Sequence, residues 1–214
     1  MKQVDNDYNA LAPFYDWLGH AVYFGAIGRS QKAYLSEIPK GLRILFIGGG
    51  TGFLLNDVLE ASAPKELVYI EKSQVMIEKS KRACKHVLKE RVRFVHGTQL
   101  DIQEGEEFDV VLSFFFFDQF RFQTLSKIFL KLDSHLKEGG LWLWSDFIPP
   151  EKWWQKFLMR TMLFFFELTT SLGTNRVYSV PEIMLKRNYR MEKESFFYRG
   201  FIRSVKLKKT SVGE

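Results

Sequence analysis

The sequence predicts an α/β fold: a mostly parallel, doubly wound sheet of seven strands that ends in a C-terminal antiparallel hairpin. Three observations carry this prediction. Short apolar runs alternate with helix-periodic segments from about residue 42 to residue 172, as in parallel sheets covered on both faces. A glycine cluster directly follows the first apolar run. Two strand-like runs near the C-terminus flank Arg199 and Gly200, which indicates a hairpin.

The individual elements follow from apolar periodicity and from residues that begin or end helices. Residues 7–38 have the pattern of two helices, broken near Gly25 to Gly28 and closed by Pro39. Gly139 and Gly140 are expected to end a helix. The expected strands are 42–47, 67–70, 92–95, 108–114, 141–144, 189–198 and 201–207. The expected later helices are 51–62, 73–89, 120–136 and 149–172, with a short one from Pro181.

A chain of 214 residues is most simply a single domain, with a core large enough to fold alone. Within 1–214 we expect four segments. These are a helical N-terminal cap at 1–40, a ligand-binding core at 41–146, a helical lid or insertion at 147–188 and the hairpin at 189–214.

Composition and charge restrict the classes of partner and compartment. The formal net charge is +6, but few aromatic side chains lie among the basic ones, which disfavours nucleic acid and leaves an anionic membrane surface or an acidic partner open. Cys84 is the single cysteine, so an internal disulfide is excluded. The apolar stretch 153–172 contains Lys156, Arg160 and Glu167, which argues against a membrane span. The N-terminus lacks the pattern of a signal peptide, and we expect a cytoplasmic protein.

The glycine cluster is the most informative motif. Gly48, Gly50 and Gly52 lie between a buried strand and a helix, where glycines let the backbone approach a ligand and helix N–H groups point at it. The dinucleotide fingerprint needs a third glycine at position 53, which is Phe53. The G-x-G-x-G spacing instead resembles motif I of the class I S-adenosylmethionine-dependent methyltransferases. A glycine-rich turn without a ligand is the structural alternative.

This resemblance implies S-adenosylmethionine as cofactor and a set of contacts at the strand ends. Glu71 closes the second strand about twenty residues after the glycines, where the family places the acidic residue that holds the ribose. The alternative is that the Glu71 carboxylate only forms an ion pair with Lys65 or Lys72. The remaining expected cofactor contacts are Lys72, Thr98, Gln99, Leu100, Ser113, Phe114 and Tyr15.

Two positions depart from the family pattern. Phe46 stands where an acidic residue usually helps to organise the methionine end of the cofactor, and Thr98 stands where an Asp usually lies near adenine. Either change could weaken cofactor binding. They favour, as an alternative to an enzyme, a non-catalytic module that keeps the fold.

The run from Phe114 to Phe117 follows the fourth strand, where the acceptor binds in this fold. Methyltransferases of exocyclic base nitrogens have Asn/Asp-Pro-Pro-Tyr/Phe there, so a DNA base is disfavoured. Phe115 and Phe117, together with Trp154 of the insertion, are the expected substrate contacts. Asp118 and Asp146, each near a strand end, are the candidate general bases.

The N-terminal segment Tyr8–Asp16 is similar to the opening of the ubiquinone/menaquinone C-methyltransferase-like group, in which it covers the cofactor. The resemblance implies that Tyr15 contacts the cofactor and Tyr8 the substrate. His20 is a third candidate catalytic residue in the same cap.

Together these features predict methyl transfer from S-adenosylmethionine to a small, apolar or aromatic metabolite. The alternatives are the non-catalytic binding module and an aminopropyltransferase-like enzyme, which would need acidic residues to hold a polyamine. No Cys/His cluster indicates a metal site. A homodimer is compatible with the sequence, which names neither the acceptor atom nor the oligomeric state.

Overall fold

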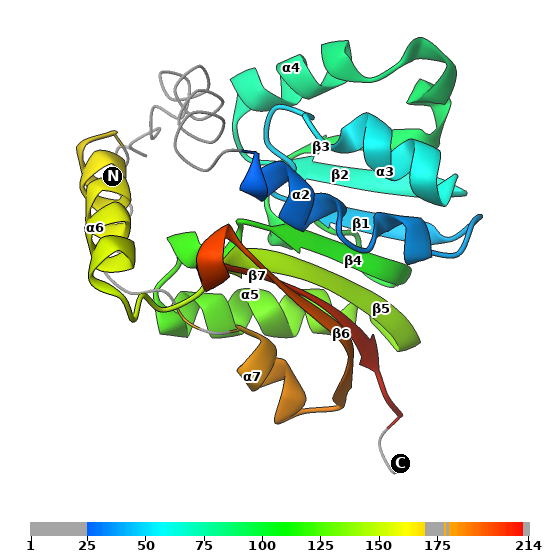
Figure 1. Ribbon diagram of the computed structural model, residues 1–214. Helices are drawn as coiled ribbons and strands as arrows, with labels where there is room; N and C mark the ends of the chain where they lie inside the picture. The colour runs from blue at the N-terminus through cyan, green and yellow to red at the C-terminus, as the bar shows by residue number, and fades with distance from the viewer. Residues whose placement is uncertain (1–24, 170–177, 179, 212–214) are drawn as a thin grey trace, which may run out of the picture.

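The structure is a computed structural model that describes residues 25–169, 178 and 180–211, with side chains at all of these except 162–169. A seven-stranded sheet runs through the molecule with helices on both faces (Figure 1). The strands are β1 (Arg43–Ile47), β2 (Glu66–Glu71), β3 (Val92–His96), β4 (Phe108–Phe114), β5 (Leu136–Phe147), β6 (Tyr189–Phe197) and β7 (Ile202–Lys209). The helices are α2 (Ala26–Lys32), α3 (Leu55–Ser62), α4 (Gln74–Ala83), α5 (Phe122–Ser134), α6 (Trp153–Thr169) and α7 (Val180–Leu185). Short 3-10 turns are η2 (Leu35–Glu37), η3 (His86–Arg91), η4 (Gln99–Asp101), η5 (Phe117–Gln119) and η6 (Tyr198–Gly200).

The strand order is β3-β2-β1-β4-β5-β7-β6, and the pairs among the first five strands are parallel. β7 is antiparallel to both β5 and β6, so the C-terminal hairpin forms one edge. The predicted fold class is therefore confirmed. The order reverses between β1 and β4, and the carboxyl ends of these two strands form the switch point at which such sheets bind ligands.

Two apolar clusters hold the layers together, one on each face of the sheet. One face packs against α5 and α7 through residues such as Phe129, Trp142 and Met184. The other packs against η2 and α3 through residues such as Leu35 and Leu59. Figure 1 shows α3 and α4 on one side of the sheet and α5 on the other. Burial on both faces explains why the parallel strands are nearly continuous apolar runs.

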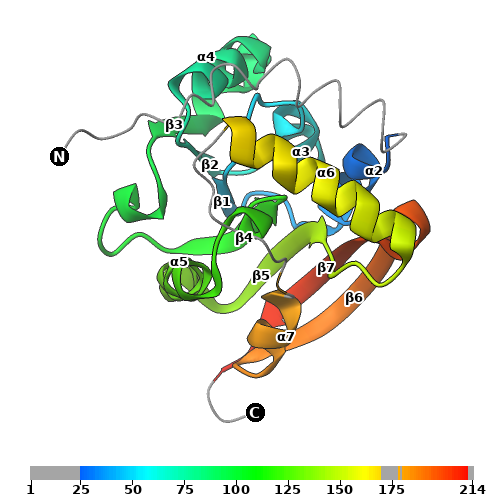
Figure 2. The same ribbon diagram turned by 90° about the vertical axis from the view of Figure 1, so that its left-hand side faces the viewer.

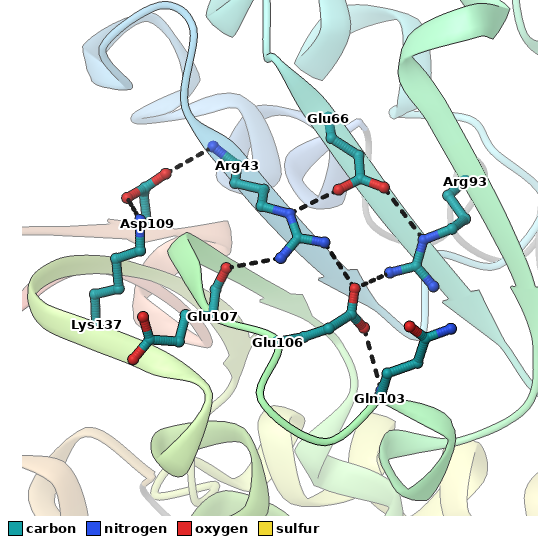
Figure 3. A network of polar contacts seen from close by, with 8 residues as sticks. All are labelled: Arg43, Glu66, Arg93, Gln103, Glu106, Glu107, Asp109 and Lys137. Carbon is teal, nitrogen blue, oxygen red and sulfur yellow. Dashed lines mark hydrogen bonds and ion pairs between the residues drawn. The ribbon is translucent and has the colours of Figure 1, made fainter.

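An ion-pair network fastens the amino ends of the strands, far from the switch point (Figure 3). Arg43 of β1 donates to Glu66 at 2.6 Å and to Glu106 at 2.7 Å. Arg93 of β3 pairs with the same two carboxylates. Asp109 accepts from the backbone N–H of Arg43 at 2.8 Å. These contacts tie four strands and the loop before β4, so their role is structural.

The helix predicted at 73–89 was too long. α4 ends at Ala83, because Asn56 of α3 donates to the Ala83 carbonyl at 2.8 Å and accepts the Lys85 N–H at 2.9 Å. A side chain from another helix thus ends α4, and a 3-10 turn follows. Only a tertiary contact encodes this end, so the local pattern did not reveal it.

The prediction that Gly139 and Gly140 end a helix was wrong. α5 ends at Ser134, and both glycines lie inside β5, which begins at Leu136. Gly139 has φ +74°, and the β4–β5 register shifts between Phe108 and Val110. The pair therefore forms a bulge in a longer strand, a usual role for glycine within strands. Of the predicted break near Gly25 to Gly28, Gly25 stands at the N-cap of α2, whereas Gly28 lies within this helix.

α6 lies beyond the carboxyl ends of the parallel strands in both views (Figures 1 and 2). The helical spacing of the sequence predicts one apolar stripe on this helix that includes Phe157 and Thr161. The structure corrects this, because both residues are exposed while Gln155 and Met159 are buried. Gln155 is buried because its amide oxygen accepts the N–H groups of the two residues that precede the helix, each at 2.9 Å.

Candidate functional site

The glycine loop links β1 to α3 at the switch point. The Gly48 N–H donates to the Ile70 carbonyl at 2.9 Å, which continues the β1–β2 ladder into the loop. Gly50 and Gly52 have φ values of +66° and +82°, a backbone region that disfavours side chains. A Cβ at position 52 would lie 2.7 Å from the Ser80 Cα, whereas one at position 50 would have no described atom within 4 Å. The loop therefore has one packed side and one open side, and a ligand can approach at Gly50.

Glu71 holds this loop in place from the end of β2. Its carboxylate accepts the Gly50 N–H at 2.9 Å and the Ser73 N–H at 2.8 Å. The residue is 8% exposed, and burial raises the pKa of its carboxyl while the backbone N–H bonds oppose that rise. An ionised carboxylate has about four acceptor positions, and the backbone N–H groups of Gly50, Ser73 and Lys72 occupy about three of them. Glu71 can thus accept a further hydrogen bond from a hydroxyl of a bound ligand.

Tyr69 is a residue that the sequence reasoning missed. Its hydroxyl donates to the Gly50 carbonyl at 3.0 Å, so the loop is held at Gly50 by both its N–H and its C=O. A Cβ at Gly49 would lie 2.2 Å from the Tyr69 ring. The extra glycine in the Gly48-Gly49-Gly50 run is the signal that could have indicated a large side chain beneath the loop.

Phe46 lies in the same aromatic cluster. Its ring centroid is 5.3 Å from that of Tyr69 and 5.8 Å from that of Phe114, both in edge-to-face geometry. Phe46 and Phe114 are both buried. Beneath the glycine loop, the place of the usual acidic side chain is therefore apolar.

The segment after β3 forms a capped turn. Asp101 accepts the Thr98 N–H at 2.7 Å, and the Thr98 hydroxyl accepts the Leu100 N–H at 3.3 Å. Asp101 thus caps its own turn, and Gln99 and Thr98 are half-buried. Leu100 is 74% exposed.

Lys72 and His96 lie near this turn. Both side chains are exposed, and the Nε2 of His96 lies 2.9 Å from the Lys72 carbonyl oxygen. Lys72, Thr98, Gln99 and Leu100 thus lie around the ends of β2 and β3, on the same edge of the sheet as Glu71. Their roles as cofactor contacts stay predictions.

The end of β4 holds four of the predicted site residues, and most of them are inside the core. The Ser113 hydroxyl accepts the Trp142 indole N–H at 2.8 Å. Phe117 is buried against Trp142, with ring centroids 6.4 Å apart. Phe115 is half-buried, has φ +48° and packs edge-on against Phe147 at 5.1 Å. Of the Phe114–Phe117 run, only Phe115 combines partial exposure with an unusual backbone conformation.

Asp118 and Asp146, predicted separately from two strand ends, lie together. The Asp118 backbone N–H donates to the Asp146 carboxylate at 3.2 Å, and the Phe147 N–H donates to that carboxylate at 2.9 Å. Both side chains are buried. Among the described residues, the Oδ1 of Asp118 has no hydrogen-bond partner.

This carboxyl pair has perturbed acidities. Burial raises the pKa of Asp118 to about 7, and burial together with the Asp118 charge raises the pKa of Asp146 well above its ordinary value. Two buried carboxyls in contact cannot easily both ionise, so the pair holds one proton near neutral pH. Such a pair can accept a proton from a bound hydroxyl or hold a cationic group.

Trp154 of α6 closes this end of the sheet. It packs edge-on against Tyr198 and Phe201, each at 5.8 Å, in an apolar cluster that also contains Phe147 and Phe115. The predicted contacts Tyr8, Tyr15 and His20 lie outside the described residues. Within the described chain, no group of three His, Cys, Asp or Glu side chains is placed to hold a metal ion.

Comparisons with known proteins agree with this geometry. Residues 45–142 match the family model for a methyltransferase domain, which covers β1 through the centre of β5. No curated protein sequence matches the chain significantly. The matched segment contains the glycine loop, Glu71 and Asp118, while Asp146 and α6 lie beyond it.

Solved structures with the same fold include several methyltransferases. The mitomycin 7-O-methyltransferase MmcR is 17% identical with a TM-score of 0.68, and the match covers 95% of this chain and 60% of that one. An O-methyltransferase family protein from Burkholderia thailandensis is 17% identical with a TM-score of 0.71, over 97% and 61% of the two chains. N-methyltransferase NodS from Bradyrhizobium japonicum WM9, in complex with S-adenosyl-L-homocysteine, is 13% identical with a TM-score of 0.68, over 97% and 100%.

The chain therefore has the Rossmann-like fold of the methyltransferases. It spans about three fifths of the first two of these proteins, so part of each has no counterpart here. Residues 45–142 thus match a methyltransferase domain, and the fold is that of the solved methyltransferases. The match and the fold give no support to the aminopropyltransferase-like or non-catalytic alternatives.

Proposed function

We propose that this protein transfers a methyl group from S-adenosylmethionine to a small, apolar or aromatic metabolite. The observation that carries the proposal is the clamp on Gly50. Glu71 and Tyr69 fix both polar groups of this residue, and its open side would admit a ligand. The complexes of similar folds with S-adenosylhomocysteine support the same cofactor here. When bound, S-adenosylmethionine supplies a methyl group activated by a sulfonium.

The residues present fit this cofactor at its nucleoside end. Glu71 offers about one further acceptor position, which suits a ribose hydroxyl. Thr98 and Gln99 lie at the end of the neighbouring strand, where we propose that they border the adenine. At the methionine end Phe46 offers no carboxylate, so we expect recognition there to rest on backbone groups of the loop.

On the acceptor side, Asp118 and Asp146 are the proposed base. A carboxyl with a pKa of about 7 accepts a proton well at neutral pH, because its basicity matches the working range. The apolar cluster around Phe115, Phe147 and Trp154 would exclude water from the acceptor. Exclusion of water and alignment of the two reactants together contribute about 7–11 kcal/mol in well-oriented systems. An apolar or aromatic acceptor fits this lining best.

The finer assignments are also proposals. The Tyr8–Asp16 resemblance supports a place near the ubiquinone/menaquinone C-methyltransferase-like group, with Tyr15 and Tyr8 over the cofactor and substrate. Quinols and phenols are thus the first acceptors to screen. We further propose a single domain with its lid at 147–188 and a cytoplasmic site of action.

The test is calorimetric titration of the full chain with S-adenosylmethionine and S-adenosylhomocysteine. We expect micromolar binding that Glu71→Gln weakens at least about tenfold, because the new amide N–H groups would face backbone donors. Glu60→Gln is the matched control, since Glu60 lies on α3, exposed, and pairs only with Lys85 among the described residues. If neither ligand binds the wild-type protein, the methyltransferase assignment fails and a non-catalytic module becomes the better interpretation.

A further inference from the structure

The exposed face of α6 is the most unusual surface of the described chain. Trp153 is 81% exposed and Phe157 is 64% exposed, one helical turn apart. Lys156 and Arg160 are also exposed and fall on the same side of the helix by their 100° spacing. The opposite side, with Trp154, Leu158 and Met159, packs into the protein. The helix thus has two different faces, one packed and one aromatic and basic, and large exposed aromatics in such a patch indicate a binding surface.

The positive charge of this face favours an anionic partner. Among the described residues, no ion pair involves Lys156, Arg160 or the neighbouring Lys152. Along the sequence the nearest acidic residues are Glu151, which precedes the helix, and Glu167, near its end. Aromatic side chains flanked by Lys and Arg on one helix face are typical of helices that lie in the plane of a membrane surface. Within the part of the chain that the structure describes, no helix combines the length and apolarity needed to cross a membrane.

The position of α6 makes such contact geometrically simple. In Figures 1 and 2 the helix lies outermost at the carboxyl ends of the strands, away from the core of the sheet. Its exposed side can therefore meet a flat surface without a change in fold. We propose that α6 docks this protein on an anionic phospholipid surface through Trp153, Phe157, Lys156 and Arg160. This inference does not rest on the proposed methyl transfer.

The test uses full-length protein and vesicles of phosphatidylcholine alone or mixed in equal parts with phosphatidylserine, without cofactor. We expect flotation with the anionic vesicles only, weakened by salt. Each basic residue near such a surface strengthens binding about fivefold, so Lys156→Gln with Arg160→Gln should lower the partition coefficient about 25-fold. Trp153→Ser with Phe157→Ser should lower it by about tenfold or more, because the buried apolar area is lost.

The control carries the same kinds of change elsewhere. Val87→Ser with Lys89→Gln alters exposed residues of η3, at the amino end of β3, and should leave flotation unchanged. All variants should keep the unfolding temperature of the wild-type protein. Failure of wild-type protein to float with anionic vesicles would overturn the proposal, as would equal loss in the control. A dimer that the α6 variants dissociate would also overturn it, because the face would then bind a second copy of this chain.

Discussion

The carboxyl pair of Asp118 and Asp146 makes a quantitative prediction about stability. An unfolded aspartate has a pKa of about 3.9, whereas burial raises the pKa of Asp118 in the folded protein to about 7. The folded state therefore binds this proton more tightly than the unfolded state. The stability that results is full below the unfolded pKa and is lost as pH rises to the folded pKa. Above pH 7 the loss approaches about 4 kcal/mol, since each pKa unit corresponds to about 1.36 kcal/mol.

Asp118→Asn removes this ionisation but keeps the backbone N–H that donates to Asp146. We expect the variant to gain stability relative to wild type as pH rises, by up to about 3 kcal/mol between about pH 5 and about pH 8. Urea unfolding followed by circular dichroism at a series of pH values measures this difference. The same variant should bind S-adenosylmethionine and lose methyl transfer, because the proposed base is gone.

Asp109→Asn provides a control of opposite sign. Although burial alone would raise the pKa of Asp109, hydrogen bonds from Lys137 and the Arg43 N–H outweigh burial and lower it. The variant should therefore be less stable than wild type at neutral pH, and the difference should shrink in acid. A constant free-energy difference for Asp118→Asn across pH would refute the reasoning, as would a variant less stable than wild type at about pH 8.

Three further predictions concern the glycine loop and the ion-pair network. Gly52→Ala should lower the free energy of unfolding by about 2–3 kcal/mol, because the new Cβ meets Ser80. Gly50→Ala should lower it by only about 1 kcal/mol, yet abolish the binding of S-adenosylhomocysteine. Equal binding by both variants would contradict the open side at Gly50. Tyr69→Phe should lower the affinity for the same ligand several-fold with about 1 kcal/mol of stability lost, measured by calorimetry and urea unfolding, and an unchanged affinity would show that the hydroxyl does not position the loop. Glu106→Gln should lower the free energy of unfolding by about 1–2 kcal/mol at neutral pH. Burial would raise the pKa of Glu106, but its hydrogen bonds to arginines outweigh burial and lower it, so the loss should vanish in acid. A loss that does not depend on pH would argue against the network.

The sheet could be predicted from sequence because its strands are buried on both faces. Strand 108–114 is a mostly apolar run between turn residues, with Asp109 and Ser113 as its polar members, and the structure has this strand with the same bounds. Glu71 could also be placed, because parallel strands that follow one another bring their carboxyl ends to one edge. The local apolar pattern was therefore enough to predict the strands and the residues at their ends.

The features that the sequence did not reveal all depend on contacts between distant residues. Asn56 ends α4 from another helix, and Gln155 is buried because it bonds the backbone before its own helix. The pairing of Asp118 with Asp146 requires β4 and β5 to be neighbours, and the sequence predicted the two carboxyls only as separate bases. Hydrophobic periodicity assigns a residue to one face of a helix or strand, but it does not identify the polar group of another segment with which that residue pairs.

Tyr69 bears on the departure at Phe46. Replacing an acidic residue with an aromatic one removes a polar group from beneath the loop, which taken alone argues for a lost cofactor site. In this chain, however, the Phe46 ring packs on Tyr69, whose hydroxyl bonds the Gly50 carbonyl, and Gly49 is the residue that leaves room for that ring. The aromatic pair and the third glycine therefore act as one unit that keeps the loop in its binding conformation. If so, Tyr69→Phe should weaken binding more than Phe46→Leu, because only the tyrosine contacts the loop through a hydrogen bond.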